Sequence, residues 1–77
     1  MPRSDAEKTQ SLRDYINFHA DTTDITEDDT HSYFRTETIM PLMMLRAMGY
    51  ETRYQDKGEC YYARILKPDW FSKDLIL

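Results

Sequence analysis

The sequence predicts an α+β fold in which three short helices precede a β-hairpin and a C-terminal tail. Three observations lead to this fold class: an apolar stripe at helical spacing near the N-terminus, a segment bounded by Pro41 and Gly49, and a change to two-residue alternation after Gly49. Seventy-seven residues make one small domain, 1–77. We expect its core to span about residues 8–67 and its tail to span residues 68–77.

The segment "SDAEKTQSLRDYINFHAD" predicts the first helix. Ser4 and Glu7 have the spacing of a capping box, in which each side chain bonds the other residue's backbone N–H. The apolar stripe that follows comprises Leu12, Tyr15, Ile16 and His19, with Phe18 beside it. This stripe should pack against the rest of the domain.

Residues 26–34 predict a short second helix. Thr26, followed three residues later by Asp29, has the pattern of an N-cap. We expect Ile25, Tyr33 and Phe34 to be buried and residues 35–37 to form a tight turn.

Residues 39–48 predict the third helix, with Thr38 as N-cap. Proline is tolerated only in the first helical turn, so Pro41 fixes the start, and Gly49 fits the left-handed position after the end. The expected buried stripe is Ile39, Leu42, Leu45 and Met48. The expected outer face is Met40, Met43, Met44 and Ala47, with Arg46 beside it.

The segment "YETRYQDKGECYYARIL" alternates around Lys57 and Gly58 and predicts the hairpin. An even-length loop keeps its apolar residues on one face by pairing Tyr54 with Tyr61, Thr52 with Ala63, Tyr50 with Ile65, and Glu51 with Arg64. The core-facing side chains should then be Tyr50, Tyr54, Tyr61 and Ile65. Arg53 and Tyr62 should point the other way.

Composition limits the function and location of the chain. The net charge of −4 argues against a general nucleic-acid binder, because phosphate affinity needs clustered cations. The charge is uneven, −5 over residues 1–34 and +2 over residues 35–67, so an anionic partner would meet the second block. The single cysteine excludes an internal disulfide. The sequence lacks a membrane-length apolar run and a signal segment, so we expect a soluble, cytoplasmic protein.

The titratable residues form no pattern that indicates an enzyme. His19, His31 and Cys60 lack partners at metal-ligand or catalytic spacing, and the consecutive carboxylates of residues 27–29 cannot face one another as an acid–base pair. With only two glycines, Gly49 and Gly58, there is no phosphate-binding glycine loop. We therefore expect no catalytic activity, no metal and no cofactor.

The order of elements resembles a winged helix-turn-helix over about residues 8–67. The best local matches are "DITEDDTHSYF" for the second helix and "LRAMGYETRYQDKGECYYARIL" for the third helix and wing. Small proteins of this kind are common among phage and prophage regulators, including excisionase-like proteins. The resemblance implies that the third helix enters the DNA major groove and that the wing contacts the backbone.

The third helix departs from that family pattern. A helix that reads DNA presents polar side chains to base edges, whereas this one presents Met40, Met43 and Met44, with only Arg46 able to donate. Methionine is common at adaptable protein-binding surfaces. Our first hypothesis is therefore a non-enzymatic, phage- or prophage-encoded protein that binds a protein partner as an inhibitor or adaptor of a host nucleic-acid machine.

Two alternatives remain open from the sequence. The methionine face could be covered within the molecule, by Trp70 and Phe71 of the tail or by a second subunit in a homodimer. The chain could instead be a sequence-specific DNA-binding regulator. In that case Arg35, Arg53 and Lys57 would contact about three phosphates.

Overall fold

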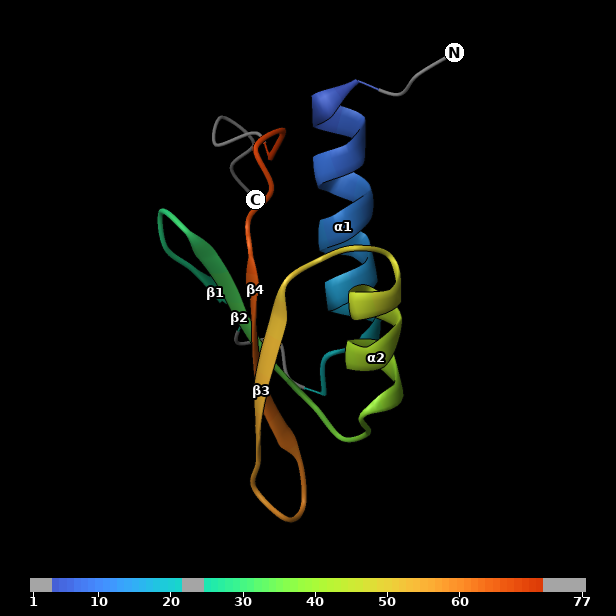
Figure 1. Cartoon of the computed structure of the whole chain (residues 1–77), viewed down its shortest axis with the longest axis vertical. Helices are drawn as coiled ribbons and strands as arrows, with labels where there is room; N and C mark the ends of the chain where they lie inside the picture. Colours follow the sequence, from blue (N-terminus) through green and yellow to red (C-terminus); the bar gives the residue numbers. More distant parts are fainter. Residues whose placement is uncertain (1–3, 22–24, 72–77) are drawn as a thin grey trace.

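A computed structural model describes residues 4–21 and 25–71, which form two helices and a four-stranded antiparallel sheet (Figure 1). Each strand pairs antiparallel with its neighbours in the order β1-β2-β4-β3. The elements are α1 (Asp5–His19), β1 (Thr26–Glu27), β2 (His31–Thr36), α2 (Met40–Ala47), β3 (Thr52–Asp56) and β4 (Tyr61–Leu66).

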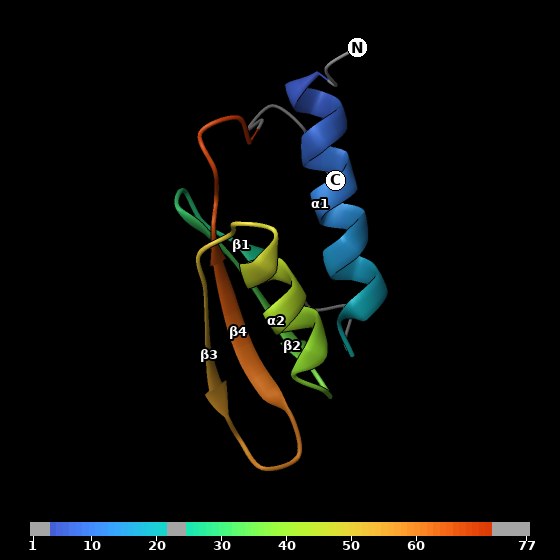
Figure 2. The same cartoon turned by 45° about the vertical axis from the view of Figure 1, so that its right-hand side comes forward.

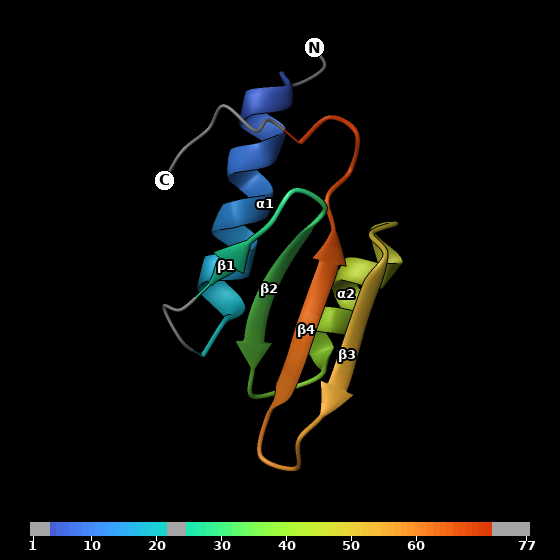
Figure 3. The same cartoon turned by 90° about the vertical axis from the view of Figure 1, so that its left-hand side faces the viewer.

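Both helices lie on the same side of the sheet (Figures 1 and 2). The core between the two layers consists of Leu12, Ile16, Phe34, Leu42, Leu45, Ala63, Ile65 and Phe71. Figure 3 looks onto the other side, where the strands lie in front of both helices. We call this second side the open face, because neither helix covers it.

The first helix is confirmed, with Ser4 as its N-cap, and the Glu7 carboxylate accepts from the Ser4 hydroxyl at 3.2 Å. The Ser4 hydroxyl accepts a hydrogen bond from the Glu7 backbone N–H at 3.2 Å. Leu12 and Ile16 are buried as expected, while Phe18 is 82% exposed. The helix therefore packs through a narrower apolar stripe than its aromatic residues suggest.

The second helix is wrong, and with it the prediction of three helices and the winged helix-turn-helix arrangement. Residues 26–36 form β1, a turn and β2 instead. The Asp28 carboxylate accepts hydrogen bonds from the backbone N–H groups of Thr30 and His31, at 2.8 and 2.7 Å. This local bonding closes a turn where a helix would need the same donors. The turn expected at residues 35–37 is also wrong, because β2 continues to Thr36.

The third predicted helix is confirmed as α2, one residue shorter at each end. Its N-cap is Ile39, without a side-chain cap bond, so the assignment of Thr38 as N-cap is wrong. Gly49 has a φ of +98°, and the N–H groups of Gly49 and Tyr50 donate to the carbonyls of Arg46 and Leu45 at 3.0 Å. These are the paired bonds of a Schellman ending, which only a residue at ease with positive φ completes without strain.

The hairpin is confirmed, but its predicted pairing is shifted by two residues. Tyr54 pairs with Ala63 and Thr52 with Ile65, because the loop has four residues, 57–60, closed by a Lys57 N–H to Cys60 carbonyl bond of 2.9 Å. The predicted faces are confirmed, since a shift of two preserves the side on which each side chain lies. Glu51 consequently does not lie opposite Arg64; Arg53 does.

The chain beyond β4 folds back over the helix layer. Phe71 is buried in the core, with the guanidinium carbon of Arg13 at 4.7 Å and the Lys67 ammonium at 5.0 Å from its ring centroid. Residues 72–77 of the predicted tail lie outside the described residues. Within the described part of the chain, neither helix has the length and apolar character that a bilayer crossing requires.

Candidate functional site

The open face carries long polar and aromatic side chains on three neighbouring strands. Strict alternation along β2, β4 and β3 turns every second residue away from the helices. The outward residues are His31, Tyr33 and Arg35 on β2, Tyr62, Arg64 and Leu66 on β4, and Arg53 and Gln55 on β3. Three of these eight residues are arginines and none is acidic.

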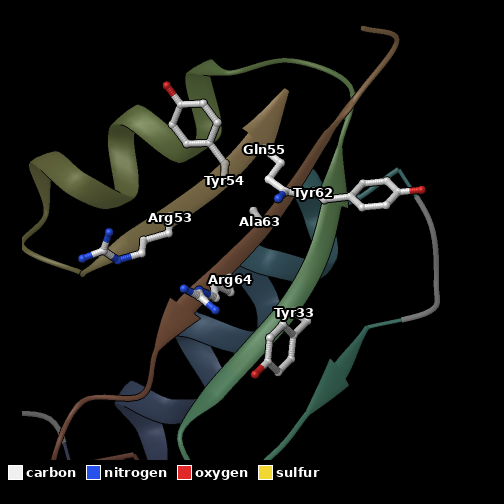
Figure 4. A pocket seen from close by; sticks show the side chains of 7 residues that line it. All are labelled: Tyr33, Arg53, Tyr54, Gln55, Tyr62, Ala63 and Arg64. Atoms are coloured by element: carbon white, nitrogen blue, oxygen red, sulfur yellow. The ribbon is translucent and has the colours of Figure 1, made fainter. Parts of the chain in front are cut away.

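Strand register places these side chains in two rows across the sheet. One row contains Tyr33, Arg64 and Arg53, which are direct cross-strand partners. The neighbouring row contains Arg35, Tyr62 and Gln55. A hollow of about 450 Å³ lies over these rows. Figure 4 shows side chains that line it, with Arg53, Arg64 and Tyr33 on adjacent strands.

Arg53 and Arg64 are cations placed directly opposite one another. Side chains in this arrangement have Cβ atoms roughly 5 Å apart, and like charges there destabilise the sheet. Among the described residues, no carboxylate lies within 4.0 Å of the Arg64 side-chain nitrogens. The nearest acid to Arg53 is Glu51 at 3.5 Å, and both side chains are exposed, so the pair neutralises little.

Arg35 differs from the other two arginines because it is already paired. Its Nε donates to the Asp21 carboxylate at 2.9 Å, and this bond raises the pKa of Arg35 above its ordinary value. The Asp21 backbone N–H also donates to the Arg35 carbonyl at 2.9 Å. Arg35 thus ties the exit of α1 to β2 and is less available to a ligand.

The aromatic rings of the open face are held in place by polar contacts. The Tyr33 hydroxyl donates to the Asp28 carboxylate at 2.6 Å, which raises the pKa of the Tyr33 phenol and lowers that of Asp28. The Tyr62 ring is 50% exposed, with the Lys57 ammonium 5.4 Å from its centroid. Both rings therefore lie at the surface. Asp28 fixes the orientation of the Tyr33 ring, and Lys57 is a neighbouring cation of the Tyr62 ring.

The structure brings together two of the three predicted nucleic-acid contacts and places the third nearby. Arg35 and Arg53 lie on the open face, and Lys57 lies at the hairpin loop over Tyr62. Sequence reasoning missed Arg64, because the shifted register assigned it to Glu51. It missed Tyr33 because that residue was expected inside a helix. The alternation of "HSYFRT" is the pattern that could have revealed it.

The predicted partner-binding residues on α2 are only partly exposed. Met40 and Met44 are 62% and 48% exposed, as expected, and Met48 is 54% exposed although we expected it to be buried. Met43 is half-buried and packs against the core, so its prediction as an outward residue is wrong. We call Met40, Met44 and Met48 the methionine surface. These residues follow one another at four-residue spacing along one side of the helix.

The Arg46 side chain makes contacts within the fold. Its Nε donates to the Thr52 carbonyl at 2.9 Å, and its guanidinium carbon lies 4.9 Å from the Tyr54 ring centroid. These contacts fasten the end of α2 to β3. They also position the C-terminal end of the methionine surface.

A groove of about 260 Å³ adjoins Met48 between the two helices. Its lining residues are Lys8, Ser11, Leu12, Tyr15, Met48, Tyr50 and Trp70. The Trp70 ring packs edge-on against Tyr50, with centroids 6.3 Å apart. Trp70 thus lines the groove beside Met48, a residue expected inside, while Phe71 enters the core instead of covering the outer methionines.

The two histidines and the cysteine lie apart from one another. His19 packs against the rings of Tyr15 and Phe18, His31 lies beside Tyr33, and Cys60 is half-buried in the hairpin loop. Among the described residues, no group of three or more potential ligands could hold a metal ion.

No protein-family model matches the chain, and comparisons with curated proteins and with solved structures found no significant similarity.

Proposed function

We propose that the protein is a non-enzymatic binding module that holds nucleic acid on the open face of its sheet. One observation carries this proposal: Arg53 and Arg64 are opposed on adjacent strands, and among the described residues no carboxylate forms an ion pair with Arg64. Opposed cations cost stability in the free protein. A phosphate that bridges them would remove this cost and add bidentate hydrogen bonds.

The charge distribution supports the same partner. The whole chain carries −4, but β2, β4 and β3 direct three arginines and no acidic residue to the open face. The carboxylates of Asp28, Asp21 and Glu51 reach this face at Tyr33, Arg35 and Arg53. A basic patch on an acidic molecule attracts a polyanion in one orientation and repels it elsewhere. Arg53, Arg64 and Lys57 supply about three phosphate contacts.

The proposal does not include the DNA-binding mode that the winged-helix resemblance implies, in which the third helix enters the major groove. α2 presents methionines to the surface and packs its other side on the sheet, so it does not offer the polar side chains that read base edges. The proposed contacts come from β3, β4 and the hairpin loop. The phage-type regulator hypothesis depended on the winged-helix order and is not proposed here.

The test is a titration of the full chain against labelled oligonucleotides at several salt concentrations, measured by fluorescence anisotropy. With about three phosphate contacts, the slope of log affinity against log salt should be roughly −2 to −3. The double variant Arg53→Ala/Arg64→Ala should flatten this slope by roughly 1.4 to 1.8. The absence of binding to every oligonucleotide at low salt would overturn the proposal.

A matched control separates local contacts from net charge. Met40→Glu/Met44→Glu reaches the same formal charge, −6, as the double arginine variant, but changes the side of the molecule away from the open face. It should keep nearly the wild-type salt slope. Equal weakening by both variants would mean that bulk charge, and not the open face, governs binding.

The methionine surface favours a second candidate function, protein contact. Three methionines exposed in line beside the groove between the helices form an adaptable apolar surface that a partner's apolar side chains would fit. The same two double variants test this second function, with the expected outcomes exchanged. A protein partner of this surface, or a second copy of the chain, should bind Arg53→Ala/Arg64→Ala as it binds wild type and should fail to bind Met40→Glu/Met44→Glu.

A further inference from the structure

We propose that the nucleic acid on the open face is single-stranded, with bases stacked on Tyr62 and Tyr33 and the backbone bridging Arg53 and Arg64. This inference rests on the proposed function and names the form of its ligand. Two features of the open face support it: the placement of the aromatic rings among the cations, and the shape of the surface.

The aromatic rings alternate with the arginines across the face. Tyr33 is the cross-strand partner of Arg64, and Tyr62 is the partner of Arg35 and Gln55. Phosphate binding alone needs no aromatic surface, whereas base stacking does. A duplex keeps its base faces inside the stack. Only an unpaired strand can therefore stack bases on the tyrosine rings and place phosphates on the arginines at the same time.

The shape of the site fits a flat strand better than a duplex. The hollow lies over β2, β4 and β3, whose backbones are spaced roughly 4.8 Å apart. Duplex readers insert a helix, a ribbon or an arm into a groove. The open face offers a platform instead, on which a strand can lie across the sheet (Figures 3 and 4).

Three further contacts prepare the site. Asp28 fixes the Tyr33 ring through the 2.6 Å hydroxyl bond, which lowers the ordering cost of binding. The Lys57 ammonium lies over one face of the Tyr62 ring, 5.4 Å from its centroid, so the proposed base stacks on the other face and the cation stays close to the strand. Gln55, next to Tyr62 in its row, carries both a donor and an acceptor for the edge of a base.

The experiment compares four ligands on the full chain: a short single-stranded oligonucleotide, the same sequence as a duplex, inorganic polyphosphate, and poly-glutamate. We expect the single strand to bind at least tenfold more tightly than each of the others. Tyr62→Ala should weaken the single strand about tenfold by loss of one stacked base and leave polyphosphate binding unchanged. Tyr62→Phe should restore the affinity, because stacking needs the ring and not the hydroxyl.

Phe18→Ala is the matched control, since Phe18 is an exposed aromatic residue on α1, outside the sheet. It should bind as wild type does. Tyr62 is half-exposed, so its variants should fold, and a circular-dichroism melt checks this. If a variant does not fold, the wild type gives an independent readout. The single strand should then quench the fluorescence of the wild-type protein, and polyphosphate should not.

The outcomes separate this inference from the proposed function. Equal affinity for single strand, duplex and polyphosphate would overturn the stacking inference and leave nucleic-acid binding in place. Preference for poly-glutamate would overturn both, because the open face would then bind an acidic peptide. No binding to any of the four ligands would likewise overturn both.

Discussion

The open face and the methionine surface differ in how the fold fixes their side chains. The open face is built on strands whose backbone hydrogen bonds set the register, so Arg53, Arg64 and Tyr33 keep their order across the sheet. The methionine surface belongs to an eight-residue helix that packs on the core through Leu42 and Leu45. A binding site made of charged groups needs its side chains at fixed positions. Flexible methionine side chains can adapt to a partner, so the helix that carries them need not be held as firmly.

The proposed function requires an acidic chain to bind an anion. The fold places the opposed pair Arg53 and Arg64 on one side of the sheet and the methionine surface of α2 on the other. Each surface can therefore be altered without touching the other. Single substitutions can disrupt this separation or test one part of it, and they differ in their expected effect on stability.

Leu45→Ala should disrupt both surfaces by loosening α2. Leu45 is fully buried, so its truncation leaves a cavity and should reduce the free energy of unfolding by about 3 kcal/mol. Urea denaturation measures the change. Met44→Ala, one position earlier on the exposed side, should cost less than about 0.5 kcal/mol. Equal losses in the two variants would contradict the assigned orientation of α2.

Glu27→Gln should weaken the attachment of α1 while leaving both surfaces intact. The Glu27 carboxylate accepts from Arg13 at 2.9 and 3.0 Å and lies 3.0 Å from the Lys67 ammonium. Losing these charged hydrogen bonds should cost about 2 kcal/mol at neutral pH. Urea denaturation measures this cost, and oligonucleotide affinity should be unchanged.

The same pair of proteins gives a pH test. The hydrogen bond from Arg13 holds the pKa of Glu27 below its ordinary value. The stabilisation is therefore complete above the unfolded-state pKa of about 4.3 and is lost as the pH falls through the folded-state pKa. The stability difference between wild type and Glu27→Gln should shrink in acid. A difference that persists there would show that the ion pairs do not stabilise the fold.

Arg64→Gln should have the smallest effect and the opposite sign. It removes the repulsion from Arg53, so the free protein should gain a few tenths of a kcal/mol at low salt. High salt should remove the gain, because exposed charges are screened. Thermal melts at low and high salt measure it. A loss of stability at low salt would mean that the two guanidinium groups do not repel one another.

The sequence was sufficient for the elements with clear ends or strict alternation. The cap at Ser4, the Schellman ending at Gly49 and the alternation of β3 and β4 each depend on local chemistry that a sequence displays. The hairpin faces were predicted correctly although the register was not, since the loop length could be two or four residues.

β2 was missed because its inward positions are mostly hydroxyl residues. Ser32 and Thr36 are buried beside Phe34, so the strand lacks the apolar alternation that predicts a half-buried strand. Thr36 is satisfied by a 2.8 Å bond to the Thr38 carbonyl, a partner that only the folded chain supplies. The open face depends on β2, so the candidate site could not be assembled from sequence alone.

The contact between Arg46 and β3 has a consequence for self-association. β3 is an edge strand. Glu51 bonds to Leu66 of β4 and Lys57 bonds to Cys60 of the hairpin loop, so the even-numbered residues between them direct their backbone groups outward. Arg46 occupies the Thr52 carbonyl, which shortens the unpaired edge that β3 presents to another chain. A strand added from another chain would lose this acceptor. One guanidinium thus makes the β3 edge a poorer template for edge-to-edge pairing.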